Sequence, residues 1–178
     1  MNRIVAVITL LAALAESTPT TGVRLPRLQA GALDGSRLAL PDSAAGNITL
    51  VGFGYQREAQ ADLNSWLEPF RREYMPADGF LACEVPMMGT RIPGLLRGVI
   101  NSAMRKAIPK ETWRWVVPFY GNIDEYSKQL GVTDRTRVQM VLLDGSGVVR
   151  WHASGRADSA RRAGLMLAVA ELAVGGGE

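Results

Sequence analysis

Only two side chains with strong nucleophilic or proton-transfer chemistry stand out in this 178-residue chain, and each type occurs once: Cys83 and His152. A single cysteine can form neither an intramolecular disulfide nor a Cys-x-x-Cys redox pair, and one Cys with one His cannot complete a four-ligand zinc site. Composition therefore excludes disulfide scaffolds, dithiol oxidoreductases and zinc modules, and we predict no metal site and no cofactor.

Cys83 lies in the apolar stretch FLACEVPMM. A reactive thiol needs an electropositive, partly exposed setting, and neither a base nor a second thiol lies near Cys83 in sequence. We therefore expect Cys83 to be buried and inert and the protein to be no enzyme. The alternative is a degenerate thiol redox enzyme, or a peroxidase-like protein, that uses this single cysteine.

The other candidates for chemistry have simpler explanations. Glu58, Glu68 and Glu73 have basic neighbours and are typical of a solvated face. His152 follows Trp151 in a β-rich run, and no nucleophile is placed in sequence to form a catalytic pair with it. The stretch Asp144-Gly145-Ser146-Gly147 is too short for an EF-hand and is explained as a turn.

The composition is that of one compact domain, with 47% apolar and 21% charged residues. The net charge of +3 arises from interspersed signs without a basic block, so no nucleic-acid partner is predicted. Residues 1–15 place Arg3 before an apolar run that ends in Ala13-Leu14-Ala15, a pattern typical of a secretory signal peptide. Residues 16–25 are predicted to be a linker and residues 26–175 the folded domain. We expect an exported, periplasmic protein; the alternatives are an uncleaved N-terminal membrane anchor or, in a eukaryote, a mitochondrial location.

Alternating patterns along the domain predict an α/β fold with a mixed central sheet. The expected elements are a hairpin around Asp34-Gly35, a doubly buried strand at 47–54, an amphipathic helix at 59–74, a strand at 80–87, a basic amphipathic helix at 92–108, an extended aromatic stretch at 112–121, a short helix at 123–131, a hairpin through 144–147 and a final helix from 158 or 159.

This order of elements resembles the thioredoxin fold over about residues 26–173. The "apolar, DG, apolar" entry, the strand ITLVGFG and the hairpin VQMVLLDGSGVVRWHASG carry the resemblance. It implies a three-layer fold with a mixed central sheet, an N-terminal hairpin and a helical insertion. Redox members of the superfamily carry a Cys-x-x-Cys motif after that strand and a cis-proline before the hairpin.

Neither redox element is present here. Counting from Phe53 places the motif on Glu58, Ala59, Gln60 and Ala61, whereas counting back from Pro69 places it on residues 61–64, and neither window contains a cysteine. Val138 occupies the position of the cis-proline. Dithiol exchange needs an activated thiolate and a resolving thiol, so the resemblance implies a retained fold without its redox chemistry. A small-molecule binding protein that uses residues 54–60 with Val138 and Gln139 is a further alternative.

A narrower resemblance points to a binding role. The segments AQADLNSWLEPF, RKAIPKETWRWVVPFYG, IDEYSKQLGV and VQMVLLDGSGVVRWHASGRAD are similar to the mitochondrial F-type ATP synthase assembly factors of thioredoxin-like fold. That family implies a non-catalytic, chaperone-type assembly protein that assists a membrane protein complex, with a membrane protein subunit as partner.

The helix at 92–108 and the aromatic residues after it are the predicted partner site. The apolar face of this helix either covers the sheet or receives a hydrophobic partner segment or the membrane headgroup layer. Arginine and aromatic side chains make binding anchors, and insertions carry specificity. The candidate partner-binding residues are Leu96, Ile100, Met104, Arg105, Lys106, Trp113, Trp115 and Phe119.

Overall fold

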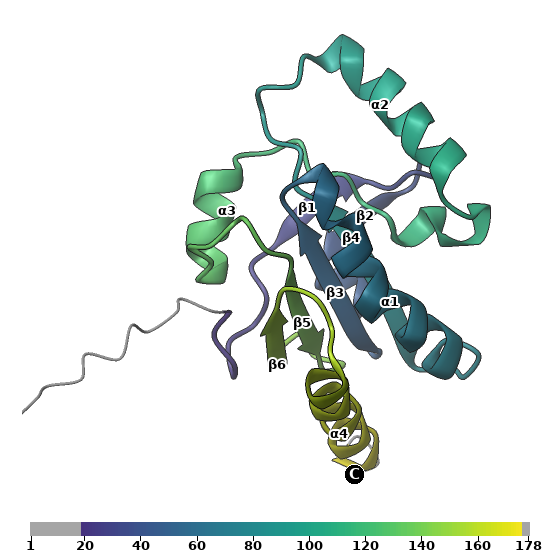
Figure 1. Cartoon of the computed structure of the whole chain (residues 1–178), viewed down its shortest axis with the longest axis vertical. Coiled ribbons are helices and arrows are strands. Elements are labelled where there is room, and N and C mark those ends of the chain that lie inside the picture. The colour runs from purple at the N-terminus through teal and green to yellow at the C-terminus, as the bar shows by residue number, and fades with distance from the viewer. Residues whose placement is uncertain (1–18, 176–178) are drawn as a thin grey trace, which may run out of the picture.

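The structure is a computed structural model that describes residues 19–175. Its central sheet has the strand order β4-β3-β5-β6, in which β3 runs parallel to β4 and antiparallel to β5, and β6 runs antiparallel to β5 (Figure 1). The elements are β1 (Leu28–Gly31), β2 (Arg37–Leu40), β3 (Ile48–Gly54), α1 (Gln60–Tyr74), β4 (Phe80–Pro86), α2 (Gly94–Ala107), α3 (Ile123–Leu130), β5 (Gln139–Leu143), β6 (Val149–Ser154) and α4 (Ser159–Gly175), with short 3-10 helices at Asp42–Ala44, Arg57–Ala59 and Lys110–Trp115. The predicted mixed α/β fold is confirmed.

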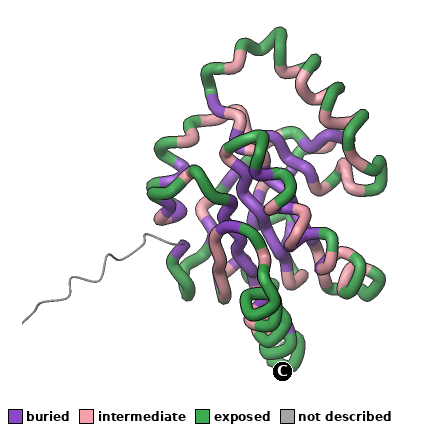
Figure 2. The backbone as a smooth tube through the Cα atoms, in the orientation of Figure 1, coloured by how far each residue is buried: buried purple, intermediate pink, exposed green. Residues whose placement is uncertain are grey.

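Two hydrophobic clusters lie on opposite faces of this sheet and make the fold a three-layer structure. One joins the sheet to the β1–β2 hairpin and α3, through residues such as Leu28, Leu40 and Tyr126. The other joins it to α1 and α4, through residues such as Trp66 and Leu165. Figure 2 shows the buried backbone concentrated in the strands between these layers. The apolar stripe of α1 faces the sheet as its spacing predicted.

β3 is buried on both faces, as the run Asn47–Gly54 predicted. Its glycines allow α1 to approach closely: a Cβ atom at Gly52 would lie 2.7 Å from Leu63 Cδ2, and one at Gly54 would lie 2.8 Å from Leu63 Cδ1. The sheet therefore holds the start of α1 directly against the end of β3.

The segment between β4 and α3 departs from the prediction. The stretch 112–121 is not extended throughout, because Lys110–Trp115 forms a 3-10 helix. Only the following residues are extended, and there Val116 forms a parallel bridge with Glu84 and Phe119 one with Met87. These contacts cover the outer edge of β4, which would otherwise expose unpaired backbone groups.

The packed domain begins earlier than the predicted boundary at residue 26. Within the predicted linker 16–25, Gly22 N–H donates to the carbonyl of Val149 at 2.7 Å, and Leu25 N–H donates to that of Gly147 at 2.9 Å. Leu25 is 2% exposed and belongs to the core. The predicted signal peptide, residues 1–15, lies outside the described residues. Among the helices of residues 19–175, none has the length and apolarity needed to cross a membrane.

The turn between β5 and β6 is built around Asp144. Its Oδ1 accepts hydrogen bonds from Ser146 N–H at 2.9 Å, Ser146 Oγ at 2.6 Å and Val148 N–H at 3.0 Å, and its Oδ2 accepts one from Arg150 Nε at 2.6 Å. Partial burial raises the pKa of Asp144, but these hydrogen bonds outweigh burial and hold the pKa at about 2. The predicted turn is confirmed, and the ionised carboxylate organises it.

We expect Asp144→Asn to lower the free energy of unfolding at pH 7 by about 1–2 kcal/mol, because the charge-assisted bond to Arg150 is lost. The folded pKa lies below the unfolded value, so the stabilisation is present above about pH 4 and is lost as the pH falls through about 2. Urea unfolding at pH 7 and pH 3 measures this. The deficit of the variant should shrink at pH 3, whereas Asp78→Asn in an exposed turn should match the wild type at both; an equal deficit at both pH values would contradict the role of the carboxylate.

Candidate functional site

The loop that follows β3 is exposed and carries no thiol. We call residues Gln56–Gln60 the tip loop; they include the 3-10 helix Arg57–Ala59 and lead directly into α1. Glu58 and Gln60 are exposed, as is Ala61 in the first turn of α1, whereas Ala59 is buried beneath them. The structure thus brings the four residues of the predicted redox window together at the carboxyl end of β3, with Glu58 and Ala61 at the two positions where dithiol chemistry would need sulfur.

Val138 and Gln139 are enclosed in the core. Val138 is fully buried, and Gln139 is 2% exposed. The side-chain amide of Gln139 donates to the carbonyl of Asp134 and to Ser154 Oγ, each at 3.1 Å. These two residues therefore brace the start of β5 and do not offer an open wall for a small-molecule pocket.

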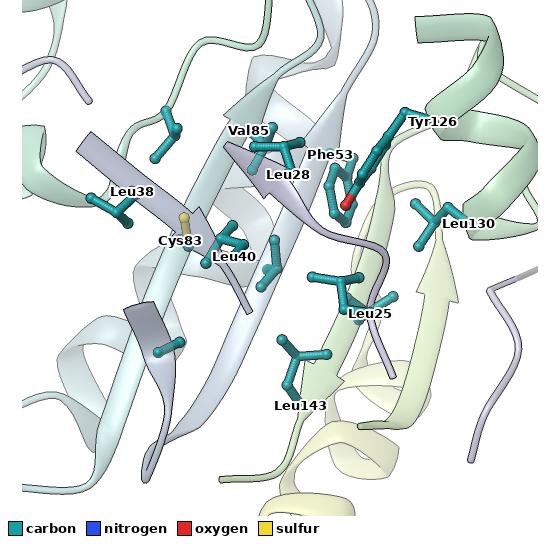
Figure 3. Packing of buried hydrophobic residues seen from close by; sticks show 14 of the residues in the cluster. Leu25, Leu28, Leu38, Leu40, Phe53, Cys83, Val85, Tyr126, Leu130 and Leu143 are labelled. Atoms are coloured by element: carbon teal, nitrogen blue, oxygen red, sulfur yellow. The ribbon is translucent and has the colours of Figure 1, made fainter. Parts of the chain in front are cut away.

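Cys83 lies in the middle of β4 and is fully buried. In Figure 3 it belongs to the cluster that includes Leu38 and Leu40 of the neighbouring hairpin. Burial raises the pKa of the Cys83 thiol to about 12, and the charge of Arg71 only partly offsets this. The thiol is therefore protonated at neutral pH and shielded from solvent, as the sequence predicted.

Cys83 cannot pair with the only histidine. Strand register places Val51 beside Cys83, Val141 beside Val51, and His152 beside Val141, so the two residues lie in one row across the sheet. Three inter-strand spacings of about 4.8 Å separate them by roughly 14 Å. Burial lowers the pKa of His152 and favours the neutral ring. A thiolate–imidazole pair of the kind used by cysteine enzymes is excluded by this distance.

Glu84 is a buried carboxyl that was not among the residues predicted from the sequence. It is 4% exposed and lies next to Gly52 in the β3–β4 register. Burial raises the pKa of Glu84, and hydrogen bonding from Gln60 and the charge of Arg71 offset this only in part. The Arg71 Nη2 atom is itself buried without a hydrogen-bond partner among the described residues. A single carboxyl in the otherwise apolar run FLACEVPMM was the available signal for this position.

Helix α2 turns its apolar residues Leu95, Leu96 and Val99 toward solvent and not toward the sheet. No residue of α2 is buried, and Figure 2 shows the helix as exposed and intermediate throughout. The side of α2 that meets the domain is mixed, with half-buried Ile100 and Met104 among its polar residues. Tyr120 OH donates to Asn101 Oδ1 at 2.7 Å, and the guanidinium carbon of Arg97 lies 4.9 Å from the centre of the Tyr120 ring. Arg105 Nε donates to the carbonyl of Leu33 at 2.6 Å. Of the two alternatives for the apolar face, cover for the sheet does not hold for Leu95, Leu96 and Val99, which are exposed.

The predicted partner-binding residues divide into two groups. Leu96 and Lys106 are exposed on α2. The others are partly buried within the domain's own contacts, where Arg105 lies over the Trp113 ring and Phe119 packs against Tyr126 with ring centres 5.5 Å apart; these residues are Ile100, Met104, Arg105, Trp113, Trp115 and Phe119. The structure brings Arg105 of α2 onto the Trp113 ring, whereas Trp115 and Phe119 pack against the core of the domain.

No group of three or more His, Cys, Asp or Glu side chains between residues 19 and 175 is arranged to hold a metal ion.

We expect the Cys83 thiol to be unreactive in the folded protein. A thiol-specific reagent such as dithionitrobenzoate should modify less than a tenth of the chain in native buffer at pH 8 and the whole thiol in urea, because the group is protonated and enclosed. The same reagent should label a Glu58→Cys variant rapidly. Fast labelling of native wild type would contradict the burial and revive the one-cysteine redox alternative.

Glu84 should make stability fall as the pH rises. Its folded pKa lies above the unfolded value of 4.5, so the folded state binds more protons and loses stability from about pH 4.5 upward, through the folded pKa. We expect Glu84→Gln to gain stability relative to wild type between pH 5 and pH 8, as measured by urea unfolding. The exposed Glu68→Gln serves as control, and parallel pH profiles for wild type and Glu84→Gln would contradict the prediction.

A scan against protein-family models found no match, and a search of curated proteins found none either. Solved structures do match. A protein assigned as the thiol:disulfide interchange protein DsbE from Chlorobium tepidum has a TM-score of 0.61 at 15% identity, over 87% of this chain and 99% of that chain. A member of the Sco family of cytochrome c oxidase assembly proteins has a TM-score of 0.60 at 10% identity, over 86% and 95%. The exposed lipoprotein thioredoxin Etrx1 from Streptococcus pneumoniae has a TM-score of 0.54 at 15% identity, over 80% and 98%. The chain has a thioredoxin-like fold.

Proposed function

We propose that this chain is a non-catalytic thioredoxin-like protein that acts by binding a protein partner, in an assembly or chaperone-type role. One observation carries the proposal: the tip loop has no thiol, and the only thiol, Cys83, is fully buried with a pKa of about 12. The loop that carries the cysteines in redox-active thioredoxin folds is therefore present here, but it lacks the thiols that would perform disulfide exchange.

The proposed partner surface is the end of the domain that carries the tip loop. Gln56, Arg57 and Glu58 are exposed there and supply an amide, a guanidinium and a carboxylate. The segment between β4 and α3, which contains α2, begins beside these residues, because Met87 N–H donates to the carbonyl of Gly54 at 2.7 Å. Exposed polar groups on a loop that a rigid sheet positions are suited to selective binding.

For the partner we favour a subunit of a membrane protein complex, and for the location export to the periplasm. The resemblance to ATP synthase assembly factors supports the first. A Sco-family assembly protein of the same fold agrees with such a role. The apolar run after Arg3 supports export, and an exposed lipoprotein shares the fold.

Site-specific photo-crosslinking tests the proposal in the full-length protein expressed in its own cells. A photo-reactive phenylalanine at Glu58 should give one dominant protein adduct, identified by mass spectrometry, because this side chain points out from the tip loop. The same group at Asp78, in the turn before β4, should give none. The adduct should persist in a Cys83→Ala background, since binding does not use the thiol.

Two outcomes would contradict the proposal. Loss of the adduct in Cys83→Ala, with far-UV circular dichroism and thermal unfolding unchanged, would show that the partner is held through thiol chemistry and would favour the redox alternative. Equal adducts from Glu58 and Asp78, or none from Glu58, would show that the tip loop is not the partner surface.

A further inference from the structure

Helix α2 presents apolar side chains to solvent on its outer side, next to the exposed polar residues Ser102 and Lys106. We define the outer stripe as Leu95, Leu96, Val99 and Ala103, which follow the helical spacing of three and four residues. Leu95 is 90% exposed, Val99 67% and Leu96 49%. Arg97, Asn101 and Arg105, on the opposite side, are occupied by contacts with the domain. The helix cannot turn its stripe inward without breaking those contacts, so the stripe is available to an external partner.

The surroundings of the outer stripe are strongly cationic. Between residues 87 and 121 there are six basic residues and one acidic residue, Glu111, a net charge of +5; the whole chain carries +3, so the remaining residues carry −2. None of these six basic side chains forms an ion pair within residues 19–175. Four of them are exposed beside α2 or at its end: Arg91, Lys106, Lys110 and Arg114. Asp34, from the β1–β2 turn, lies within electrostatic reach of Arg114 but forms no ion pair with it, so most of the positive charge of this segment is available to a partner.

This charge selects the kind of partner. A second copy of the chain placed on the stripe would bring two segments of net charge +5 together, which is unfavourable in the low dielectric of an interface. Binding to an anionic surface is favoured by two contributions to the free energy: the basic groups are neutralised, and the apolar stripe is removed from water. Charge complementarity thus favours an anionic partner over self-association.

The shape of α2 matches a broad flat surface. The helix lies above the sheet at one end of the molecule, and all its residues are at least partly exposed, so the stripe forms a ridge (Figure 1). Its 14 residues span about 21 Å, too short for the roughly 30 Å hydrocarbon core. Helices with an apolar face and flanking basic residues lie in the interfacial plane, with the apolar side chains at the boundary between headgroups and acyl chains. We propose that α2 docks the domain onto the surface of an anionic lipid bilayer through Leu95, Leu96 and Val99.

This membrane contact is separate from the protein partner proposed for the tip loop. Lipid would lie against the outer stripe, whereas the tip loop belongs to the neighbouring end of the sheet, where Met87 pairs with Gly54. A domain held in this way would meet its protein partner next to the bilayer. Either contact can exist without the other, and the two are measured by different experiments.

A local fluorescence probe tests the proposal in the full-length protein. Cys83 is buried, so a Leu96→Cys variant can be labelled with the polarity-sensitive dye NBD at the introduced thiol alone. Vesicles of 70% phosphatidylcholine and 30% phosphatidylglycerol should raise its emission several-fold and shift it to the blue, and nitroxide-labelled lipid should quench it. Pure phosphatidylcholine vesicles should have little effect. The same dye at Leu167→Cys, exposed on α4, should respond to neither, which separates insertion of α2 from attachment through another segment.

Variants that remove positive charge provide a second test of membrane docking. Lys106→Gln with Lys110→Gln should weaken vesicle binding, read at the Leu96 probe, by about fivefold for each charge removed, and high salt should do the same. Arg162→Gln on α4 should leave binding unchanged. Equal responses to neutral and anionic vesicles, or equal responses at positions 96 and 167, would overturn the proposal. A Leu96 response to detergent-extracted membrane proteins but not to vesicles would also overturn it and assign the stripe to a protein groove.

Discussion

The double burial of β3 is the constraint on which the rest of the structure depends. Every residue from Thr49 to Gly54 is buried, because the β1–β2 hairpin and α3 cover one face of the sheet and α1 and α4 the other. A central strand enclosed in this way must be apolar and must carry small residues where a helix approaches, which Gly52 and Gly54 supply under Leu63. The end of β3 is thereby fixed, and the tip loop is displayed on a rigid base.

The same enclosure decides the chemistry of β4. Cys83 faces the hairpin side of the sheet and Glu84 the α1 side, so neighbouring residues are removed from water by different layers. Burial disfavours the charged form of both, which leaves a protonated thiol and a carboxyl with a raised pKa. Cys83 is fixed within a paired strand on the other side of the sheet, whereas Glu84 lies close enough to the tip loop for Gln60 to hydrogen-bond to it. Both titratable groups of β4 are therefore enclosed in the core, whereas Gln56, Arg57 and Glu58 of the tip loop are exposed.

Features that depend on neighbouring residues could be predicted from the sequence, whereas features that depend on contacts between distant residues could not. The strand at 47–54, the turn at Asp144 and the short helix at 123–131 are set by nearby residues, and the structure confirms them. The absence of a thiol from the tip loop could also be predicted from the sequence, because residues 56–60 contain no cysteine. The orientation of α2 was not, because its periodicity shows that two faces exist but not which one meets the domain. That choice depends on Tyr120, Trp113 and Leu33, which come from separate parts of the chain.

The attachment of α2 explains how an apolar helix face remains available. A helix that buries its apolar stripe gains most of its stability from that burial and has nothing left to offer a partner. Here the anchor consists of hydrogen bonds from Tyr120 and Arg105 and of guanidinium–ring contacts at Tyr120 and Trp113, each worth about 0.5–2 kcal/mol. These contacts are directional, so they fix the rotation of the helix without using Leu95 or Val99. The directional polar contacts therefore keep the stripe on the outside, while Ile100 and Met104 are half-buried on the side that meets the domain.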